Sequence, residues 1–374
     1  MAIGGASTYV GWAGNNSPFV KVYPWTGVFG TAVANPATLP VTAGVEISWS
    51  PLGGYICVTM EGTPGMMVYP WTGAFGTKLT DPATVPGVFG NRAEMLSDES
   101  YLFCVSQNTP FIYGYPFTGA IGTKITDPGT LPAGTGLGMA VAPADNFIAV
   151  THVTTPFISI YPFASGAYGT KVANPVSLPA GLGRTVRFNP SGASVGLAHD
   201  TSPFVKSWPW TGVFGTVHTQ PAQLIGGPGR GYSYSRDGLF VYMASQTSPY
   251  MYAWPYTDAS GFGTVIANPG TLPAGSGYAG TWSSDQLFFG GASQVTPFAE
   301  AWAWSAGAWG TKVTAISPAA PGLARGLEFN TIAGAGAAAG AAQTFAAGRG
   351  HSSNKQQTGQ GSSWKRDHTT AERF

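Results

Sequence analysis

Charged side chains are scarce in this sequence. They make up 9% of its 374 residues, and 17 Lys and Arg nearly balance 16 Asp and Glu, so the formal net charge is +1. Binding to nucleic acid depends on basic side chains that neutralise phosphates. The near-neutral balance therefore gives no reason to expect a nucleic-acid partner.

Cysteines and long apolar runs are also few. Cys57 and Cys104 are the two cysteines, and they occupy corresponding strands of neighbouring repeats, one position out of phase. A one-residue offset turns a strand side chain to the opposite face, so we expect no disulfide between them. The first six residues lack a charged segment and an apolar run, so we expect no signal peptide. No segment has the length of a transmembrane helix, and we expect no membrane insertion.

Catalytic sequence patterns are absent as well. The sequence has no Gly-x-Ser-x-Gly elbow, no HExxH and no P-loop. It has no recurring pair of carboxylates of the kind that glycoside hydrolysis requires. We therefore expect a non-catalytic protein without a cofactor.

Internal repetition is what the sequence has in abundance. Two landmarks recur together, each advancing by 46 to 48 residues. The first is a proline between a small polar residue and an aromatic residue or glycine, at Pro18, Pro64, Pro110, Pro156, Pro203, Pro249 and Pro297. The second is a Gly-Thr step, at Gly30, Gly76, Gly122, Gly169, Gly215, Gly263 and Gly310. Two landmarks that keep one period seven times indicate seven copies of one structural unit.

Each unit reads as four short strands. In the second copy these are Val45–Ser50, Tyr55–Met60, Met66–Trp71 and Thr77–Thr80, separated by Gly- and Pro-rich turns. A unit of four strands and about 46 residues has the length of a propeller blade. The sequence therefore predicts an all-β fold, a seven-bladed β-propeller with four-stranded blades.

The register of the repeats predicts how the ring closes. The chain starts at the second strand of a blade, and the missing first strand reappears at Leu327–Asn330. Arg325-Gly-Leu-Glu-Phe-Asn330 matches Arg184-Thr-Val-Arg-Phe-Asn189, which opens a complete blade. Pairing of the N- and C-terminal strands would remove an open sheet edge. We predict a propeller over residues 1–331, followed by a Gly/Ala-rich and polar tail over residues 332–374.

The repeats resemble those of known propeller families. Ser17-Pro-Phe-Val-Lys-Val-Tyr-Pro-Trp-Thr-Gly27 and Asn189-Pro-Ser-Gly192 are similar to WD40-like and YVTN-like repeats, and the likeness spans about residues 1–331. The repeated phrase beginning Tyr-Pro-Trp-Thr-Gly resembles propeller proteins encoded by tailed bacteriophages. That resemblance implies a virion protein, associated with the capsid or the tail.

Two histidines form the strongest metal candidate. His152 and His199 each lie four residues before the landmark proline, and Asp200 follows His199. By analogy with WD40 blades, this turn lies on the face that usually binds partners. No third histidine accompanies them, so we expect polar rim residues and no metal site.

The turn after the second strand is polar in most repeats. Its amides and hydroxyls could hydrogen-bond a sugar or a protein backbone, or they could only cap the turn beside them. The candidate face-binding residues are Asn15, Asn16, Gln107, Asn108, Gln246 and Gln294.

The tail differs in composition from the repeats. Its glycine, alanine and polar residues predict disorder in isolation, and it ends in an aromatic and basic segment. Trp364 and Phe374 would be apolar anchors, and Lys365 and Arg366 would face an acidic surface of another virion protein.

Three hypotheses for the function follow. The first is a non-catalytic propeller of a bacteriophage virion, located on the particle and docked by its tail, which could also adhere to a host-surface glycan. The second is a lectin-like carbohydrate-binding propeller. The third and weakest is a lactonase-like propeller enzyme, because the sequence lacks the acidic central cluster that metal-dependent versions need.

Overall fold

The secondary structure of the chain is β-strand. The computed structural model describes residues 7–223, 225–316 and 320–330. In these ranges the strands form seven antiparallel sheets of three or four strands, and no helix is present that could cross a membrane. The predicted tail lies outside the described residues, so its assignment as a separate segment stays a prediction.

The strands are grouped by their place in the sheet, counted outward from the centre. The innermost strands are β3 (Gly44–Trp49), β6 (Gly90–Met95), β9 (Gly136–Val141), β13 (Gly183–Phe188), β16 (Gly229–Tyr234), β20 (Gly277–Trp282) and β24 (Ala324–Phe329). The second strands are β1 (Tyr9–Gly14), β4 (Tyr55–Met60), β7 (Tyr101–Ser106), β10 (Phe147–His152), β14 (Ser194–His199), β17 (Phe240–Ser245) and β21 (Phe288–Ser293). The third strands are β2 (Val20–Pro24), β5 (Met66–Pro70), β8 (Ile112–Pro116), β11 (Ile158–Ala164), β15 (Val205–Pro209), β18 (Met251–Thr257) and β22 (Ala299–Ser305). Short fourth strands are β12 (Ala167–Tyr168), β19 (Gly261–Phe262) and β23 (Ala308–Lys312).

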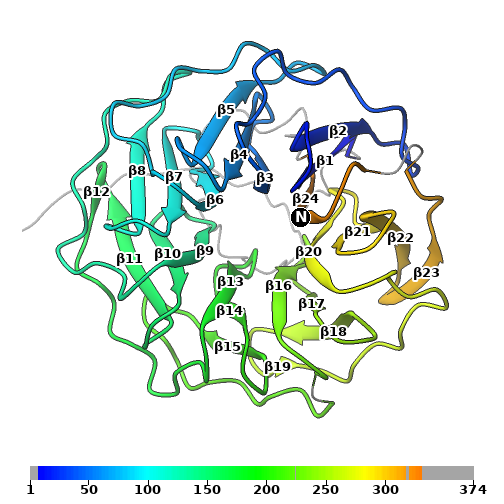
Figure 1. Cartoon of the computed structure of the whole chain (residues 1–374). Coiled ribbons are helices and arrows are strands. Elements are labelled where there is room, and N and C mark those ends of the chain that lie inside the picture. Colours follow the sequence, from blue (N-terminus) through cyan, green and yellow to red (C-terminus); the bar gives the residue numbers. More distant parts are fainter. Residues whose placement is uncertain (1–6, 224, 317–319, 331–374) are drawn as a thin grey trace, which may run out of the picture. The chain divides into compact units, whose positions relative to one another are not determined.

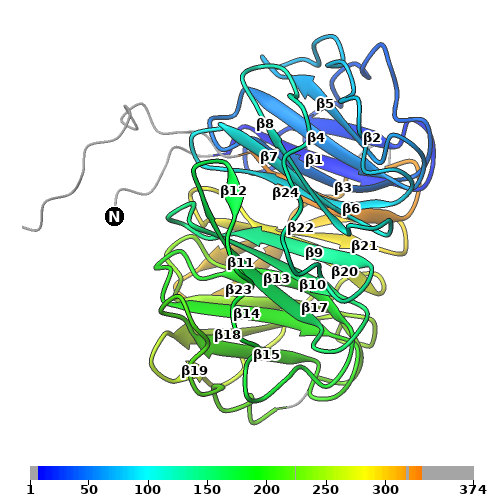
Figure 2. The same ribbon diagram turned by 90° about the vertical axis from the view of Figure 1, so that its left-hand side faces the viewer.

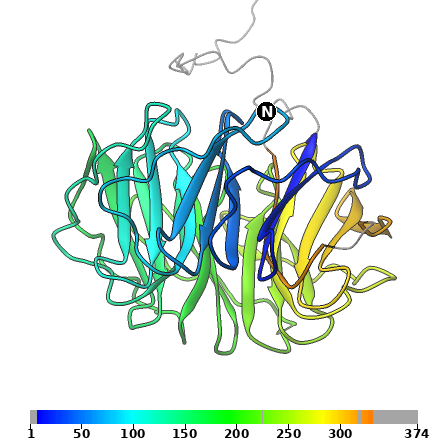
Figure 3. The same ribbon diagram turned by 45° about the horizontal axis from the view of Figure 1, so that its top comes forward.

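The sheets stand around a central axis. Figure 1 shows the innermost strands surrounding a central opening, with the second and third strands farther out. In the side views the sheets stand next to one another and their strands run across the thickness of the ring (Figures 2 and 3). Radial sheets around one opening make a β-propeller, the fold that the repeats predict.

The second strands explain how the sheets pack. Their side chains are apolar on both faces, and from the second residue onward they are buried in β4, β7, β10, β17 and β21. A strand that is buried on both faces reads as a continuous apolar run. These strands therefore lie between two neighbouring sheets, and the core is divided among the interfaces of adjacent blades.

The fourth strand is where the prediction was wrong. Thr77–Thr80 is not a strand, and four of the seven sheets have three strands, with an isolated bridge such as Trp71↔Phe75 beyond the third. The reason lies in Pro70, whose carbonyl oxygen accepts a hydrogen bond from the outer segment at Gly76 N, 2.8 Å away. A proline at this place has no N–H to return to the outer segment. The sheets with Pro162 and Pro255 at this position have outer strands of only two residues, β12 and β19, whereas the sheet with Ala303 there has the longest outer strand, β23.

Ring closure is confirmed. β24 pairs antiparallel with β1, with Trp12 opposite Leu327 and Val10 opposite Phe329. Asn330 fixes the joint, because its side-chain oxygen accepts hydrogen bonds from the backbone N–H groups of Thr8 (2.9 Å) and Tyr9 (2.8 Å). The last innermost strand therefore completes the sheet that contains the first two strands of the chain.

Aromatic pairs join neighbouring blades. In each blade, the residue after the recurring proline of the third strand (Ala303 in one blade) is aromatic and buried. In six blades this ring packs edge to face against another aromatic ring, which lies at the start of the second strand in the preceding blade. The ring centroids are 4.9–5.2 Å apart. The pairs are Trp25–Phe288, Trp71–Tyr9, Phe117–Tyr55, Phe163–Tyr101, Trp210–Phe147 and Trp304–Phe240. Edge-to-face geometry is favourable for aromatic rings, and these contacts hold adjacent sheets together.

Candidate functional site in the central channel

Many of the charged side chains lie around a cavity at the centre of the ring. The cavity has a volume of about 480 Å³ and is lined by the innermost strands and by the turns that follow them. In a chain with 17 basic and 16 acidic residues, eight charged side chains line this one space. They are Glu46, Arg92, Glu94, Asp145, Arg187, Arg236, Arg325 and Glu328.

The register of the innermost strands brings these side chains together. Glu46 and Arg92 are the third residues of β3 and β6, while Glu94, Arg187 and Glu328 are the fifth residues of β6, β13 and β24. Equivalent positions of the repeats face one shared axis, so residues far apart in sequence become neighbours. The third position of β24 is Gly326, where an added Cβ would lie 2.7 Å from the Cα of Glu46. Glycine thus permits the close approach of these innermost strands.

A connected set of ion pairs occupies the middle of the channel. Arg92 is buried and pairs with Glu46, and its Nε donates a hydrogen bond to Glu94 at 2.7 Å. Arg187 adds an ion pair to Glu94 at 3.3 Å, and the backbone N–H of Val141 donates to the same carboxylate at 3.0 Å. Burial alone would raise the pKa of Glu94, but Arg92 and Arg187 outweigh it and lower this pKa. Glu94 is therefore a fixed anion that positions both arginines.

Glu328 differs from the other channel carboxylates. Its backbone carbonyl accepts a hydrogen bond from Trp49 Nε1 at 3.2 Å, which fixes the strand. Its Oε2 atom is buried and has no hydrogen-bond partner among the described residues. Burial raises the pKa of Glu328 above that of an ordinary glutamate, although Arg92 and Arg187 oppose the shift. A partly desolvated carboxylate with a free oxygen and a raised pKa is suited to accept and return a proton.

Arg236 is the cation that faces this carboxylate without a partner of its own. It lines the same cavity, in the turn after β16, and forms no ion pair within the described ranges. Burial lowers the pKa of Arg236, and the charge of Glu328 opposes the shift. A guanidinium held in this way can donate hydrogen bonds to an oxygen that gains negative charge.

The predicted metal candidates lie elsewhere. His152 and His199 end β10 and β14 and are completely buried, so the expectation that they are polar rim residues was wrong. Burial lowers the pKa of each to about 4. His152 Nε2 lies 3.1 Å from the Ser159 hydroxyl, while Asp200 is half-buried beyond the strand end. In the described part of the chain, no group of three His, Cys, Asp or Glu side chains is arranged to hold a metal ion.

The polar turns are separate from the charged cavity. Asn15, Asn16, Gln107 and Gln294 are exposed, and Asn108 and Gln246 are half-buried; none of them lines the cavity. Asn16 donates a side-chain hydrogen bond to the Pro321 carbonyl at 2.9 Å, which joins the turn after β1 to the segment before β24. Their role in binding a partner stays a prediction.

The four predicted partner-binding residues belong to the C-terminal tail. Trp364, Lys365, Arg366 and Phe374 lie outside the described residues, so the docking-arm hypothesis stays a prediction.

Sequence reasoning missed the channel charges. A signal was available, because the few charged residues of the chain gather at the starts of repeats, as in Asn91-Arg-Ala-Glu94 and Arg184-Thr-Val-Arg187. Only the second of these segments entered the prediction, as the strand that matches Arg325–Asn330, and its charges were not considered. Scanning the aligned first strands for charge would have shown that the third or fifth positions of β3, β6, β13 and β24 contribute charged side chains to a shared channel.

Comparisons with known proteins place the fold. No protein-family model and no curated protein matches the chain by sequence. The periplasmic gluconolactonase of Pseudomonas aeruginosa is similar in structure, with a TM-score of 0.68 and 15% identity over 87% of this chain and 99% of that one. A candidate 6-phosphogluconolactonase of Bacteroides fragilis has a TM-score of 0.67 and 12% identity over 87% of this chain and 98% of its own. A Lactobacillus plantarum protein has a TM-score of 0.68 and 13% identity, with 87% and 100% covered.

These likenesses support the β-propeller fold and correct the predicted function. We expected a non-catalytic bacteriophage virion protein, but two of these neighbours are named as a gluconolactonase and a candidate 6-phosphogluconolactonase, and none of the three is named as a virion protein. The expectation arose from one repeated phrase, whose aromatic residues, such as Tyr69 and Trp71, are buried and pack within and between blades. The innermost strands, which that phrase does not include, carry the charged side chains.

Proposed function

We propose that this protein is a seven-bladed propeller hydrolase that opens the ring of a polar lactone in its central channel. The observation that carries the proposal is Glu328, a carboxylate with a buried, unpartnered oxygen in a cavity that it shares with four arginines. The likeness to a gluconolactonase over nearly the whole ring supports the choice of substrate class.

Glu328 would act as the general base. Its free oxygen would accept a proton from a water molecule as the water oxygen forms a bond to the lactone carbonyl carbon. Because burial raises the pKa of Glu328, its carboxylate is a stronger base than that of an exposed glutamate. When the ring C–O bond breaks, the same group would return the proton to the ring oxygen, so that water and lactone give the open hydroxy acid.

Arg236 would stabilise the developing charge. The carbonyl oxygen becomes an oxyanion when water adds, and a guanidinium without a carboxylate partner can donate hydrogen bonds to it. Arg92 and Arg187 are less available, because Glu46 and Glu94 already hold them. Their positive charge would still lower the energy of an anion in the cavity.

The test is an assay of glucono-δ-lactone hydrolysis. The rate is measured from the release of protons, and the rate of the spontaneous reaction is subtracted. We expect Glu328→Gln to lower kcat/KM by roughly 10²- to 10⁴-fold, the range for loss of a general base. Arg236→Gln should lower it by about 10²- to 10³-fold, as for loss of an oxyanion donor.

Glu99→Gln is the matched control. Glu99 lies outside the cavity and accepts a hydrogen bond from the Leu52 N–H at 2.9 Å, which glutamine can keep. This variant should retain wild-type activity. Wild-type protein that does not exceed the spontaneous rate with γ- or δ-lactones of sugar acids would refute the proposal, as would full activity of Glu328→Gln.

A further inference from the structure

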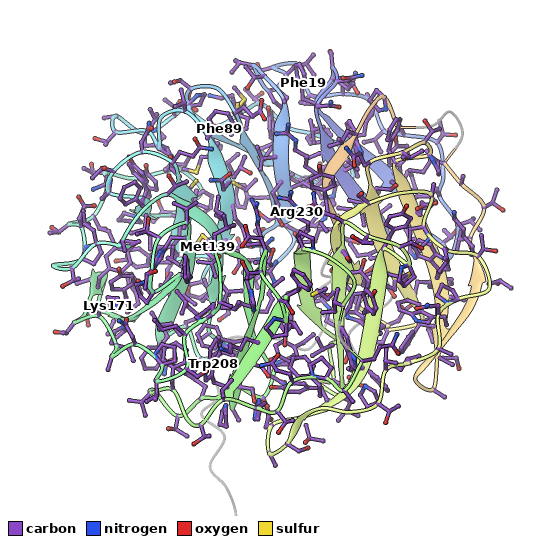
Figure 4. All side chains as sticks on the ribbon, turned by 60° about the horizontal axis from the view of Figure 1, so that its bottom comes forward. Phe19, Phe89, Met139, Lys171, Trp208 and Arg230 are labelled. Carbon is purple, nitrogen blue, oxygen red and sulfur yellow. The ribbon has the colours of Figure 1, made fainter. Side chains whose placement is uncertain are left out.

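A second group of cations lies on the same innermost strands, at a different level. Arg184, Arg230 and Arg325 are the second residues of β13, β16 and β24, and Tyr278 holds this position in β20. In ring order they are consecutive, so they form an arc around part of the channel. Arg230 lies beside the central opening (Figure 4). Second and fifth strand positions are roughly 10 Å apart along a strand, and Arg184 and Arg230 do not line the cavity that holds Glu328.

Arg184 and Arg230 are neighbours through their backbones. Thr185, next to Arg184, donates its hydroxyl hydrogen bond to the Arg230 carbonyl at 2.7 Å. The Arg230 guanidinium lies over the ring of Tyr278, 5.6 Å from its centroid. An arginine stacked on an aromatic face is held in orientation while its N–H edge stays available.

These two arginines have unused donors. The Nε atoms of Arg184 and Arg230 are both buried, and neither has a hydrogen-bond partner in the described ranges. Within the same ranges neither arginine forms an ion pair, whereas Arg325 pairs with Glu61. Asp200 is the carboxylate whose charge acts on Arg184. Two like charges held side by side with unmet donors are unfavourable unless an anion joins them.

We propose that Arg184 and Arg230, with Tyr278 beside them, form an oxyanion-binding site that takes a carboxylate or a phosphate group. Two guanidinium groups present N–H donors that match the oxygens of either group. The site uses none of the residues assigned to lactone opening, so it goes beyond that function and stands or falls separately from it.

The experiment is calorimetric titration of the full-length protein in a buffer without competing oxyanions. Inorganic phosphate and acetate are the two probes, and the tighter of them identifies phosphate or carboxylate as the preferred group. We expect Arg184→Gln and Arg230→Gln each to weaken binding roughly tenfold or more, the effect of losing a charge-assisted hydrogen bond. Arg184→Lys and Arg230→Lys keep the charge and should weaken it less, which covers the case in which a glutamine variant does not fold.

Two variants serve as controls. Lys21→Gln removes a cation from β2, far along the chain from the arc, and should leave binding unchanged. Glu328→Gln should also bind the anion normally, even if it cannot hydrolyse a lactone. Absence of binding by both probes would overturn the proposal, and so would equal weakening by Lys21→Gln, which would mean non-specific attraction.

Discussion

Phe329 lies in β24, the strand that closes the ring, and replacing it tests whether the propeller opens between β24 and β1. Phe329 is fully buried in β24 and packs edge to face on Trp25, with the ring centroids 5.0 Å apart. Phe329→Ala removes this ring from a close-packed interface, and such a change typically reduces the free energy of unfolding by about 3–5 kcal/mol. Since 1.4 kcal/mol is a factor of ten, the equilibrium constant for opening would rise by roughly two to three and a half decades.

Phe188→Ala is the matched control. Phe188 is the sixth residue of β13, as Phe329 is of β24, and it packs against Trp210 at 5.7 Å with a similar degree of burial. Both variants should lose comparable overall stability. Only β1 and β24, the first and last strands of the described ring, can separate from each other while the other sheets stay folded.

Amide hydrogen exchange distinguishes the two variants, because it reports local opening strand by strand. In Phe329→Ala the amides of Val10–Ala13 should exchange about 10²- to several 10³-fold faster, while those of Val195–Ala198 should change little. In Phe188→Ala no such difference between the two segments is expected. Equal acceleration of both segments in Phe329→Ala would mean that the joint does not open separately, and the reasoning would be refuted.

Three further predictions follow from burial and topology. The pKa of about 4 for His152 and His199 lies below the value near 6.5 of histidine in an unfolded chain, so the unfolded state binds more protons between these pH values. The free energy of unfolding should therefore fall as the pH falls through this window, by up to about 3 kcal/mol for each histidine. The double variant His152→Asn with His199→Asn should show a flatter dependence of stability on pH in denaturant titrations. Lactone hydrolysis should rise with pH through the raised pKa of Glu328, and residual activity of Glu328→Gln should lack this step in a pH–rate profile. Deletion of residues 325–374 should abolish cooperative melting in calorimetry, because it removes the strand β24 that pairs with β1. Deletion of residues 345–374 should leave the melting transition unchanged. Equal melting of both truncated proteins would contradict the closure of the ring by β24.

The positions of the strands were largely predictable from the repeat, because turn-forming residues mark both ends of each apolar segment. Tyr55–Met60 was predicted with the bounds that the structure gives to β4, and Val45–Ser50 differs from β3 by one residue at each end. The outer strand at Thr77–Thr80 was predicted wrongly, because a local pattern does not reveal that Pro70 leaves the outer segment without a donor. Closure was predictable because it depends on register alone.

The candidate site was not predictable in the same way. Glu94 and Glu328 are separated by most of the chain, and only the circular arrangement places them near the same arginines. His152 and His199 were prominent in sequence because histidine is rare here, yet both are buried at strand ends. Rarity drew attention to these residues, whereas the charge of the innermost strands becomes informative only when seven aligned positions are considered together.

The division of each blade into packing strands and an innermost strand has an evolutionary consequence. The second and third strands hold the aromatic and apolar contacts between blades, while the channel chemistry depends on a few positions of the innermost strand. A repeated gene segment can therefore preserve its scaffold while each copy drifts independently at the positions that face the axis. The present chain has glycine at Gly138 and Gly231 where other copies have Glu46 and Arg92. Seven copies that began alike can in this way have produced an asymmetric channel, and selection or protein engineering could alter its chemistry one blade at a time.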